Sequence, residues 1–184
     1  MWHALLRDTR LYDLLYRLDE DLAARARAEG CGCGGVLHRA RYPRKPRGGP
    51  PDLGAEHEGR LSFCCAREGC RRRKTPPSVR FLGRRVYFGA VVVLVSALRD
   101  GLSVRRVRML RERLGVDART LRRWRQWWQK AFVASRFWKA GRGRLVPPVD
   151  ERALPAALLE RFSAQDPCER LLQTLRFLAP LSIG

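Results

Sequence analysis

Clustered cysteines constrain this chain more than any other feature of its sequence. Five of the six cysteines fall within residues 31–33 and 64–70. The surrounding segment, 31–77, is rich in Gly, Pro and Arg, a composition too polar to build a core alone. Two thiolate pairs brought together by hairpins form a tetrahedral zinc site. The sequence therefore predicts a small module held by a structural Zn²⁺, with free buried cysteines and a redox pair as the alternatives.

The two groups offer more candidate ligands than a tetrahedral site needs. The preferred ligands are Cys31, Cys33, Cys65 and Cys70. Neighbours on a strand point to opposite faces, so only one of Cys64 and Cys65 reaches the metal easily, and Cys65 has the shorter interval to Cys70. Cys64 is an alternate, and His38 can replace one cysteine. Zinc ribbons usually have C-x-x-C pairs, unlike the C-x-C and C-x-x-x-x-C here, and four protein ligands leave no position open for catalysis.

Basic residues dominate the middle of the chain. The 184 residues carry 38 Lys and Arg against 18 Asp and Glu, a formal net charge of +20. Residues 31–80 have 12 basic and 4 acidic side chains and residues 81–146 have 17 and 3, whereas both ends are near neutral. Such a distribution suits phosphate neutralisation, so a nucleic acid is the expected partner. A solubilising surface is the alternative.

Hydrophobic spacing and turn residues predict a mainly α-helical fold. Leucines at helical intervals predict an amphipathic helix over 9–29 that ends at Gly30. Short strands are expected over 36–42 and 60–65. The later helices are expected over 84–99 with a stop at Asp100-Gly101, from an N-cap at Ser103 to Gly115, from an N-cap at Asp117 to about Phe132, and over about 154–162 and 167–178.

Residues 107–124 resemble the helix-turn-helix of DNA-binding proteins. The core positions of that motif are filled by Leu110, Leu114, Val116, Leu121 and Trp124. Gly115 stands where the turn needs a residue with positive φ, and Asp117 can cap the second helix. Arg111 departs from the motif, which usually has a small residue between its helices. An ordinary Arg-rich helical hairpin is the alternative.

The resemblance implies a recognition helix over 118–129 in the major groove of DNA. The side chains that it places at base edges are Arg119, Arg122, Arg123 and Gln126. The expected phosphate contacts are Arg105, Arg106, Arg108 and Arg113. The aromatic residues Trp127, Trp128, Phe137 and Trp138 are expected in the core, with a stacking platform for single-stranded nucleic acid as the alternative.

The combination of a cysteine-pair module with a helix-turn-helix resembles the zinc-ribbon plus helix-turn-helix proteins of bacterial insertion sequences. Phe63 two residues before Cys65 and the basic residues directly after Cys70 carry this resemblance, which spans about 31–132. It implies a zinc-dependent protein that binds double-stranded DNA for element-end recognition or regulation. The expected parts are an N-terminal helix (1–30), a small β zinc-ribbon module (31–80), a helix-turn-helix domain (81–146) and a C-terminal helical tail (147–184).

We expect no catalytic activity, because residues 81–146 offer only three acids and strand transfer needs carboxylates on an α/β scaffold. Expected partners are DNA, a separately encoded transposase or integrase, and a second copy of the chain. No signal peptide is apparent, and the apolar run 86–98 is shorter than the roughly 20 residues of a membrane span. A cytoplasmic, nucleoid-associated location is therefore expected. The rival function is that of a basic zinc-ribbon RNA-binding or ribosome-associated protein.

Overall fold

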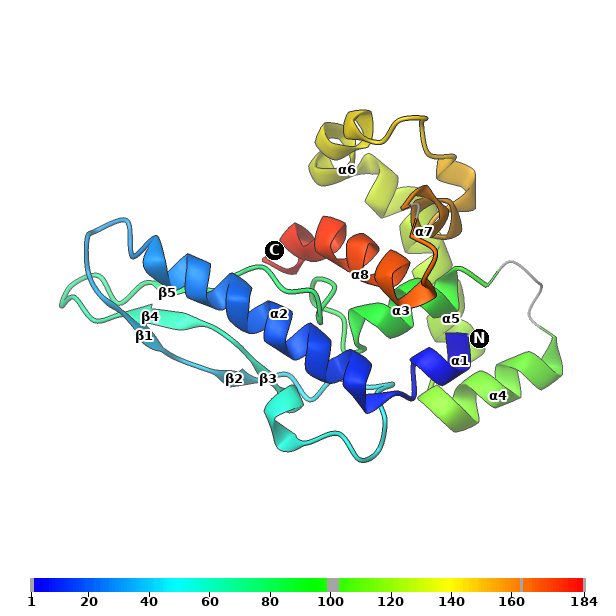
Figure 1. Cartoon of the computed structure of the whole chain (residues 1–184), viewed down its shortest axis with the longest axis horizontal. Coiled ribbons are helices and arrows are strands. Elements are labelled where there is room, and N and C mark those ends of the chain that lie inside the picture. The colour runs from blue at the N-terminus through cyan, green and yellow to red at the C-terminus, as the bar shows by residue number, and fades with distance from the viewer. Residues whose placement is uncertain (1, 99–102, 163, 184) are drawn as a thin grey trace.

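The sheet and the helices lie at opposite ends of the molecule. The computed structural model describes residues 2–98, 103–162 and 164–183. It is mainly helical, with a small antiparallel sheet and a group of four cysteines, which confirms the predicted fold at this coarse level. The sheet and its loops lie beside one end of a long helix, and the other helices gather around the opposite end (Figure 1). No helix within the described ranges is both long and apolar enough to cross a membrane.

The long helix α2 (Thr9–Ala28) connects these two ends. Asp8 caps it by accepting a hydrogen bond from the Arg10 N–H at 3.1 Å, and Gly30, at φ +70°, follows its end as predicted. Its buried face consists of Leu11, Tyr12, Leu15, Asp19, Ala23 and Ala26. A short helix absent from the prediction, α1 (Trp2–Leu5), precedes α2.

Two small antiparallel sheets form the cysteine-rich part. The first has the order β1 (Leu37–Arg39), β4 (Phe63–Cys65), β5 (Arg73–Lys74), and the second pairs β2 (Tyr42–Pro43) with β3 (Gly59–Arg60). Each of the strands predicted over 36–42 and 60–65 is thus interrupted. Between the paired segments, the Ser62 hydroxyl donates a hydrogen bond to the Ala40 carbonyl. A side chain, and not a backbone N–H, therefore uses this carbonyl of the ladder.

Helices make up most of the remaining chain. Their bounds are α3 (Gly89–Ser96), α4 (Val104–Leu114), α5 (Ala118–Trp127), α6 (Arg136–Gly141), α7 (Ala156–Arg161) and α8 (Pro167–Leu178). Single turns occupy η1 (Ala55–Glu58), the π-helical η2 (Trp128–Phe132), η3 (Arg142–Arg144), η4 (Glu151–Ala153) and η5 (Ala179–Ser182). The helix α6 was not predicted, and the helix expected to reach Phe132 changes to π-helical pairing after Trp127.

The helix expected over 84–99 is shorter than predicted. It begins at Gly89, because residues before it are extended: the Arg47 N–H bonds to the Val86 carbonyl at 2.7 Å and the Phe88 N–H bonds to the Arg47 carbonyl at 3.1 Å. It ends at Ser96, and the predicted end at Arg99 with its Asp100-Gly101 stop lies outside the described residues. All eight residues of α3 are buried, as the apolar run predicts.

The buried side chains form two clusters, and α2 contributes to both. The larger cluster joins Leu11, Tyr12 and Leu15 to α3, α5 and α8. The smaller one consists of Ala23, Ala26, Leu37, Leu61, Phe63 and Cys65, with three further cysteines packed against it. The cysteine-rich part therefore has little apolar surface of its own to bury.

A buried ion pair connects α2 to the segment after the sheet. The Arg80 Nε donates to Asp19 Oδ2 at 2.8 Å, and both side chains are 0% exposed. Asp19 also accepts from the Ser78 hydroxyl at 2.5 Å and the Val79 N–H at 2.7 Å. The remaining Arg80 nitrogens donate to the carbonyls of His57 and Gly59. The pair is thus fully hydrogen-bonded, the condition under which buried charges are tolerated.

Replacing Asp19 should destabilise the protein strongly. Asp19→Asn leaves the buried Arg80 guanidinium without its counter-charge, and breaking a buried pair in this way costs about 3–5 kcal/mol. Asp21→Asn is the matched control, because Asp21 is exposed on the same helix and such surface changes stay within about 0.5 kcal/mol. Urea unfolding curves measure both variants, and equal midpoints would contradict a structural role for the pair.

Candidate metal centre and basic helical face

Four cysteine sulfurs converge at the far end of the sheet. Cys31 and Cys33 come from the turn after α2, Cys65 ends β4, and Cys70 follows in the next loop. All four sulfurs lie within 4.8 Å of one another. The Cys31 and Cys70 sulfurs are 3.7 Å apart and those of Cys33 and Cys65 are 3.5 Å apart. These are the four residues that the sequence analysis prefers as ligands.

The other two candidate ligands do not join this group. Cys64 points away: its thiol donates to the Arg71 carbonyl at 3.5 Å. His38 lies opposite Cys64 in the β1–β4 register and is exposed. The alternation of side chains along β4 therefore separates Cys64 from Cys65, as expected for strand neighbours.

The surroundings of this group favour ionisation of the Cys33 thiol and disfavour ionisation of the Cys65 thiol. The Gly35 N–H, with help from the Cys70 and Cys65 thiols, lowers the pKa of Cys33 to about 6. At Cys65 the Arg67 N–H favours the thiolate, but burial and the neighbouring thiols raise the pKa to about 12. Ionisation of one thiol thus hinders its neighbour, and a bound cation removes that opposition.

The geometry fits a tetrahedral thiolate-bound metal ion. Metal–sulfur bonds of about 2.3 Å place the sulfurs of a tetrahedral site about 3.8 Å apart. The distances of 3.5 and 3.7 Å are close to that value. Gly35 leaves the space that the group needs, because a Cβ there would lie 2.6 Å from the Cys65 sulfur. The described residues thus contain a four-cysteine group able to hold a metal ion.

The cysteine group should carry about one metal ion per chain. Protein purified without a metal-affinity tag is assayed by elemental analysis. Cys33→Ser removes a ligand, so we expect loss of the metal and unfolding of the module at lower temperature. Cys64→Ser is the matched control and should retain the metal, because its thiol faces the Arg71 carbonyl. Metal-free wild-type protein would refute the site.

The predicted turn between α4 and α5 is present. Ser103 caps α4 by accepting from the Arg106 N–H at 3.3 Å, and Gly115 ends it at φ +65°. Asp117 caps α5 by accepting from the Thr120 N–H at 2.6 Å, a bond that lowers the pKa of its carboxyl. The Tyr87 hydroxyl donates to the Gly115 carbonyl at 2.7 Å, which fixes the turn on the core.

Helix α5 has an apolar and a basic face. Leu121 and Trp124 are buried, and Trp128 in the following turn is 0% exposed. The side chains expected at base edges are all exposed: Arg119, Arg122, Arg123 and Gln126. Arg122 Nε donates to the Ala118 carbonyl at 3.3 Å, and Arg123 donates to Thr120 Oγ1 at 3.4 Å. The face is therefore positively charged and open to a ligand.

The expected phosphate contacts gather on α4. A shallow hollow of about 490 Å³ is lined by all four of them: Arg105, Arg106, Arg108 and Arg113. Arg108 also lies 4.0 Å from Glu112, an exposed pair that contributes little to stability. Helix α4 projects from the body of the molecule near α5 (Figure 1). Its basic side is thus accessible.

Two further arginines, which the sequence did not point to, extend this basic surface. Arg84 and Arg85 line a hollow of about 360 Å³ together with Thr120 and Arg123. The Arg85 guanidinium carbon lies 3.7 Å from the Trp127 ring centroid, and burial lowers the pKa of Arg85 to about 10. The two arginines were missed because the sequence predicted a helix from residue 84, whereas they lie in and just after a turn that the Arg85 N–H closes on the Leu82 carbonyl.

The aromatic residues are mainly core. Trp128 is 0% exposed and Trp138 is 1% exposed, and Phe132 lies between them with ring centroids 4.8 and 5.0 Å away. Trp138 Nε1 donates to Glu151 at 2.6 Å, and Trp127 is covered by Arg85. This cluster therefore offers no open row of rings on which bases could stack.

Comparisons with protein-family models, with curated proteins and with solved structures found no match to this chain. The sites described above therefore rest on the geometry of the chain itself.

Proposed function

We propose that the chain is a non-catalytic, zinc-dependent protein that binds double-stranded DNA. The α4–α5 pair acts as a helix-turn-helix, with α5 as the recognition helix in the major groove. The basic face of α5 carries this proposal: three exposed arginines and a glutamine project opposite a buried stripe, and both the turn and the cap suit the motif.

The side chains of α5 match the chemistry of base recognition. Arginine binds guanine O6 and N7 through two donors, and glutamine binds adenine N6 and N7. Arg105, Arg106, Arg108 and Arg113 on α4 suit the flanking phosphates, whose contacts fix register rather than sequence. Arg84 and Arg123, which line one hollow beside the start of α5, extend this basic surface.

Zinc has a structural role in this proposal. Four thiolates suit Zn²⁺ and leave no open position for water or substrate. The small core beside them has few apolar side chains, so metal binding supplies the stabilisation that the module lacks. The β1–β4–β5 sheet with its cysteine loops corresponds to the zinc ribbon of the resemblance.

Two acids of the helical part already have structural partners, which is in keeping with the non-enzymatic function that we propose. Asp117 caps α5, and Glu151 binds Trp138 and Arg142, contacts that lower the pKa of its carboxyl. Carboxylates for two-metal chemistry need to converge with free oxygens. A role at the ends of a transposable element, together with a separate transposase or integrase, follows from the resemblance to insertion-sequence proteins.

Selection from a randomised duplex DNA pool at about 150 mM salt tests this function, because nonspecific phosphate binding is already weakened there. We expect enrichment of one motif by the wild-type chain. Arg122→Ala with Arg123→Ala should abolish the preference, at about 1–3 kcal/mol per lost base contact. An inverted repeat in the enriched motif would indicate a homodimer.

The control variant, Arg17→Ala with Arg25→Ala, removes the same charge from exposed positions of α2 and should keep the preference. Uniform recovery of sequences by the wild-type chain, or preferential binding of added RNA, would refute sequence-specific DNA binding. In that case the basic zinc-ribbon RNA-binding function would take its place.

A further inference from the structure

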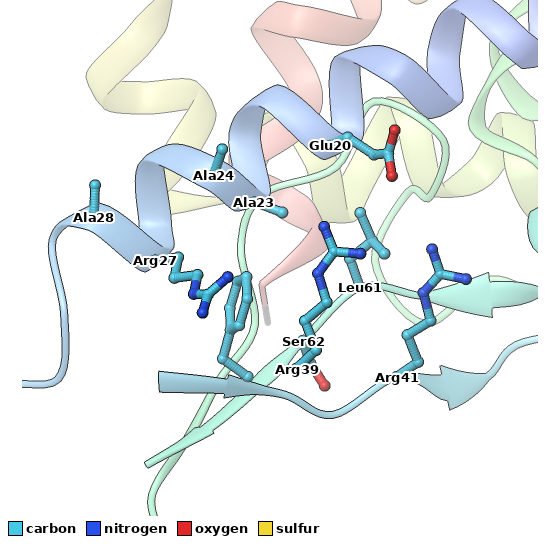
Figure 2. Close-up of a pocket in the computed structure, with 10 residues that line it drawn as sticks. Glu20, Ala23, Ala24, Arg27, Ala28, Arg39, Arg41, Leu61 and Ser62 are labelled. Carbon is cyan, nitrogen blue, oxygen red and sulfur yellow. The ribbon is translucent and has the colours of Figure 1, made fainter. Parts of the chain in front are cut away.

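A pocket of about 420 Å³ lies between the second half of α2 and the sheet. It is separate from the cysteine group and from the basic faces of α4 and α5. Figure 2 shows side chains of α2 above it and those of β1 and the β3–β4 segment below. Its volume falls in the range of about 300–1,000 Å³ that is usual for small-ligand sites.

The floor of the pocket is apolar. Ala23, Leu61 and Phe63 line it, and all three belong to the small hydrophobic cluster. Alanine at positions 23, 24 and 28 keeps α2 from filling the space with longer side chains. A flat, weakly polar group can therefore enter between the helix and the sheet.

The rim of the pocket is basic. Arg27 comes from α2, Arg39 from β1 and Arg41 from the segment after it (Figure 2). Arg41 donates to the Tyr16 hydroxyl, which holds it in place. Within the described ranges, neither Arg27 nor Arg39 has an acidic partner within 4 Å. Two guanidinium groups are thus left for an external anion, and their planar forks suit phosphate oxygens.

Glu20 adds a negatively charged hydrogen-bond acceptor to the basic rim. Its carboxylate, which lies on the same rim, only accepts hydrogen bonds when ionised and would repel a simple anion. A matching ligand therefore has both an anionic end and a group with hydrogen-bond donors. Guanine carries two adjacent donors, N1–H and the N2 amino group, on one edge.

We propose that this pocket binds a guanine nucleotide. The phosphate is held by Arg27 and Arg39, the base lies over the apolar floor, and its donor edge faces Glu20. The ligand is either a free nucleotide or the 5′-terminal nucleotide of a nucleic-acid strand, since both present the same groups. This site goes beyond the DNA-reading function of α5 and does not depend on it.

Isothermal titration calorimetry of the full zinc-loaded chain at about 150 mM salt tests the proposal. Guanosine 5′-monophosphate should bind at about one site per chain and at least about tenfold more tightly than inorganic phosphate or uridine 5′-monophosphate. Arg27→Ala with Arg39→Ala should weaken binding at least about tenfold, because charge-assisted bonds to phosphate are lost. Glu20→Gln should reduce the preference for guanosine over uridine monophosphate.

Arg25→Ala is the matched control, because Arg25 lies on α2 but lines a different hollow. It should leave the affinity within about twofold. A 5′-phosphorylated single-stranded pentanucleotide beginning with guanosine distinguishes the two ligand sources: tighter binding than the mononucleotide indicates a strand end, and weaker binding a free nucleotide.

The proposal is overturned if guanosine monophosphate shows no saturable binding up to about 1 mM, a concentration that corresponds to about 4 kcal/mol of binding free energy. Equal binding by the Arg27/Arg39 and Arg25 variants, or an affinity for inorganic phosphate equal to that for guanosine monophosphate, also overturns it. So does displacement of guanosine monophosphate by pentaglutamate, an acidic peptide, at a concentration similar to that of the nucleotide. Duplex selection with the Arg27/Arg39 variant should still yield the wild-type motif. Failure of the pocket is thereby distinguished from failure of DNA recognition by α5.

Discussion

The Asp19–Arg80 pair joins parts of the chain that have little else in common. It connects α2 to the segment that leads into α3, and through the carbonyls of His57 and Gly59 it also holds the start of β3. Because both charges are removed from water, the arrangement is stable only when every donor and acceptor meets its partner. This requirement fixes one position of the sheet against α2. The small apolar cluster between α2 and the sheet does not fix that position as precisely.

The cysteine-rich part therefore depends on contacts at both of its ends. At one end the buried pair ties residues 57–80 to α2, and at the other end the four sulfurs join the turn after α2 to β4 and the loop that follows it. Between these two points, the small cluster of the described residues has five further buried apolar side chains: Ala23, Ala26, Leu37, Leu61 and Phe63. Such sparse packing leaves room for the pocket over Ala23 and Phe63, which a larger hydrophobic core would fill.

Features with a local cause could be predicted from the sequence, and features with a distant cause could not. Gly115, Asp117 and the preferred cysteines were found because turn, cap and strand alternation depend on neighbouring residues.

Asp19 sits on the apolar stripe of α2, and only its partner 61 positions away makes an acid acceptable there. Residues 84–88 carry the composition of a helix, but a turn at residues 83–84 and backbone hydrogen bonds of Val86 and Phe88 with Arg47 keep them from forming one. The basic hollow beside α5 was missed for that reason, and the pocket beside α2 because its rim is assembled from three separate segments.

Helix α2 also sets the angular phase between the two halves of the molecule. Leu11 in the large cluster and Ala26 in the small one are 15 residues apart, roughly 22 Å along one helix axis. A single inserted residue between them would turn everything beyond it by about 100° and displace Asp19 or the alanines from their side of the helix. The length of α2 thus behaves as a fixed dimension: its residues can be substituted, but its residue count determines how the sheet faces the helices.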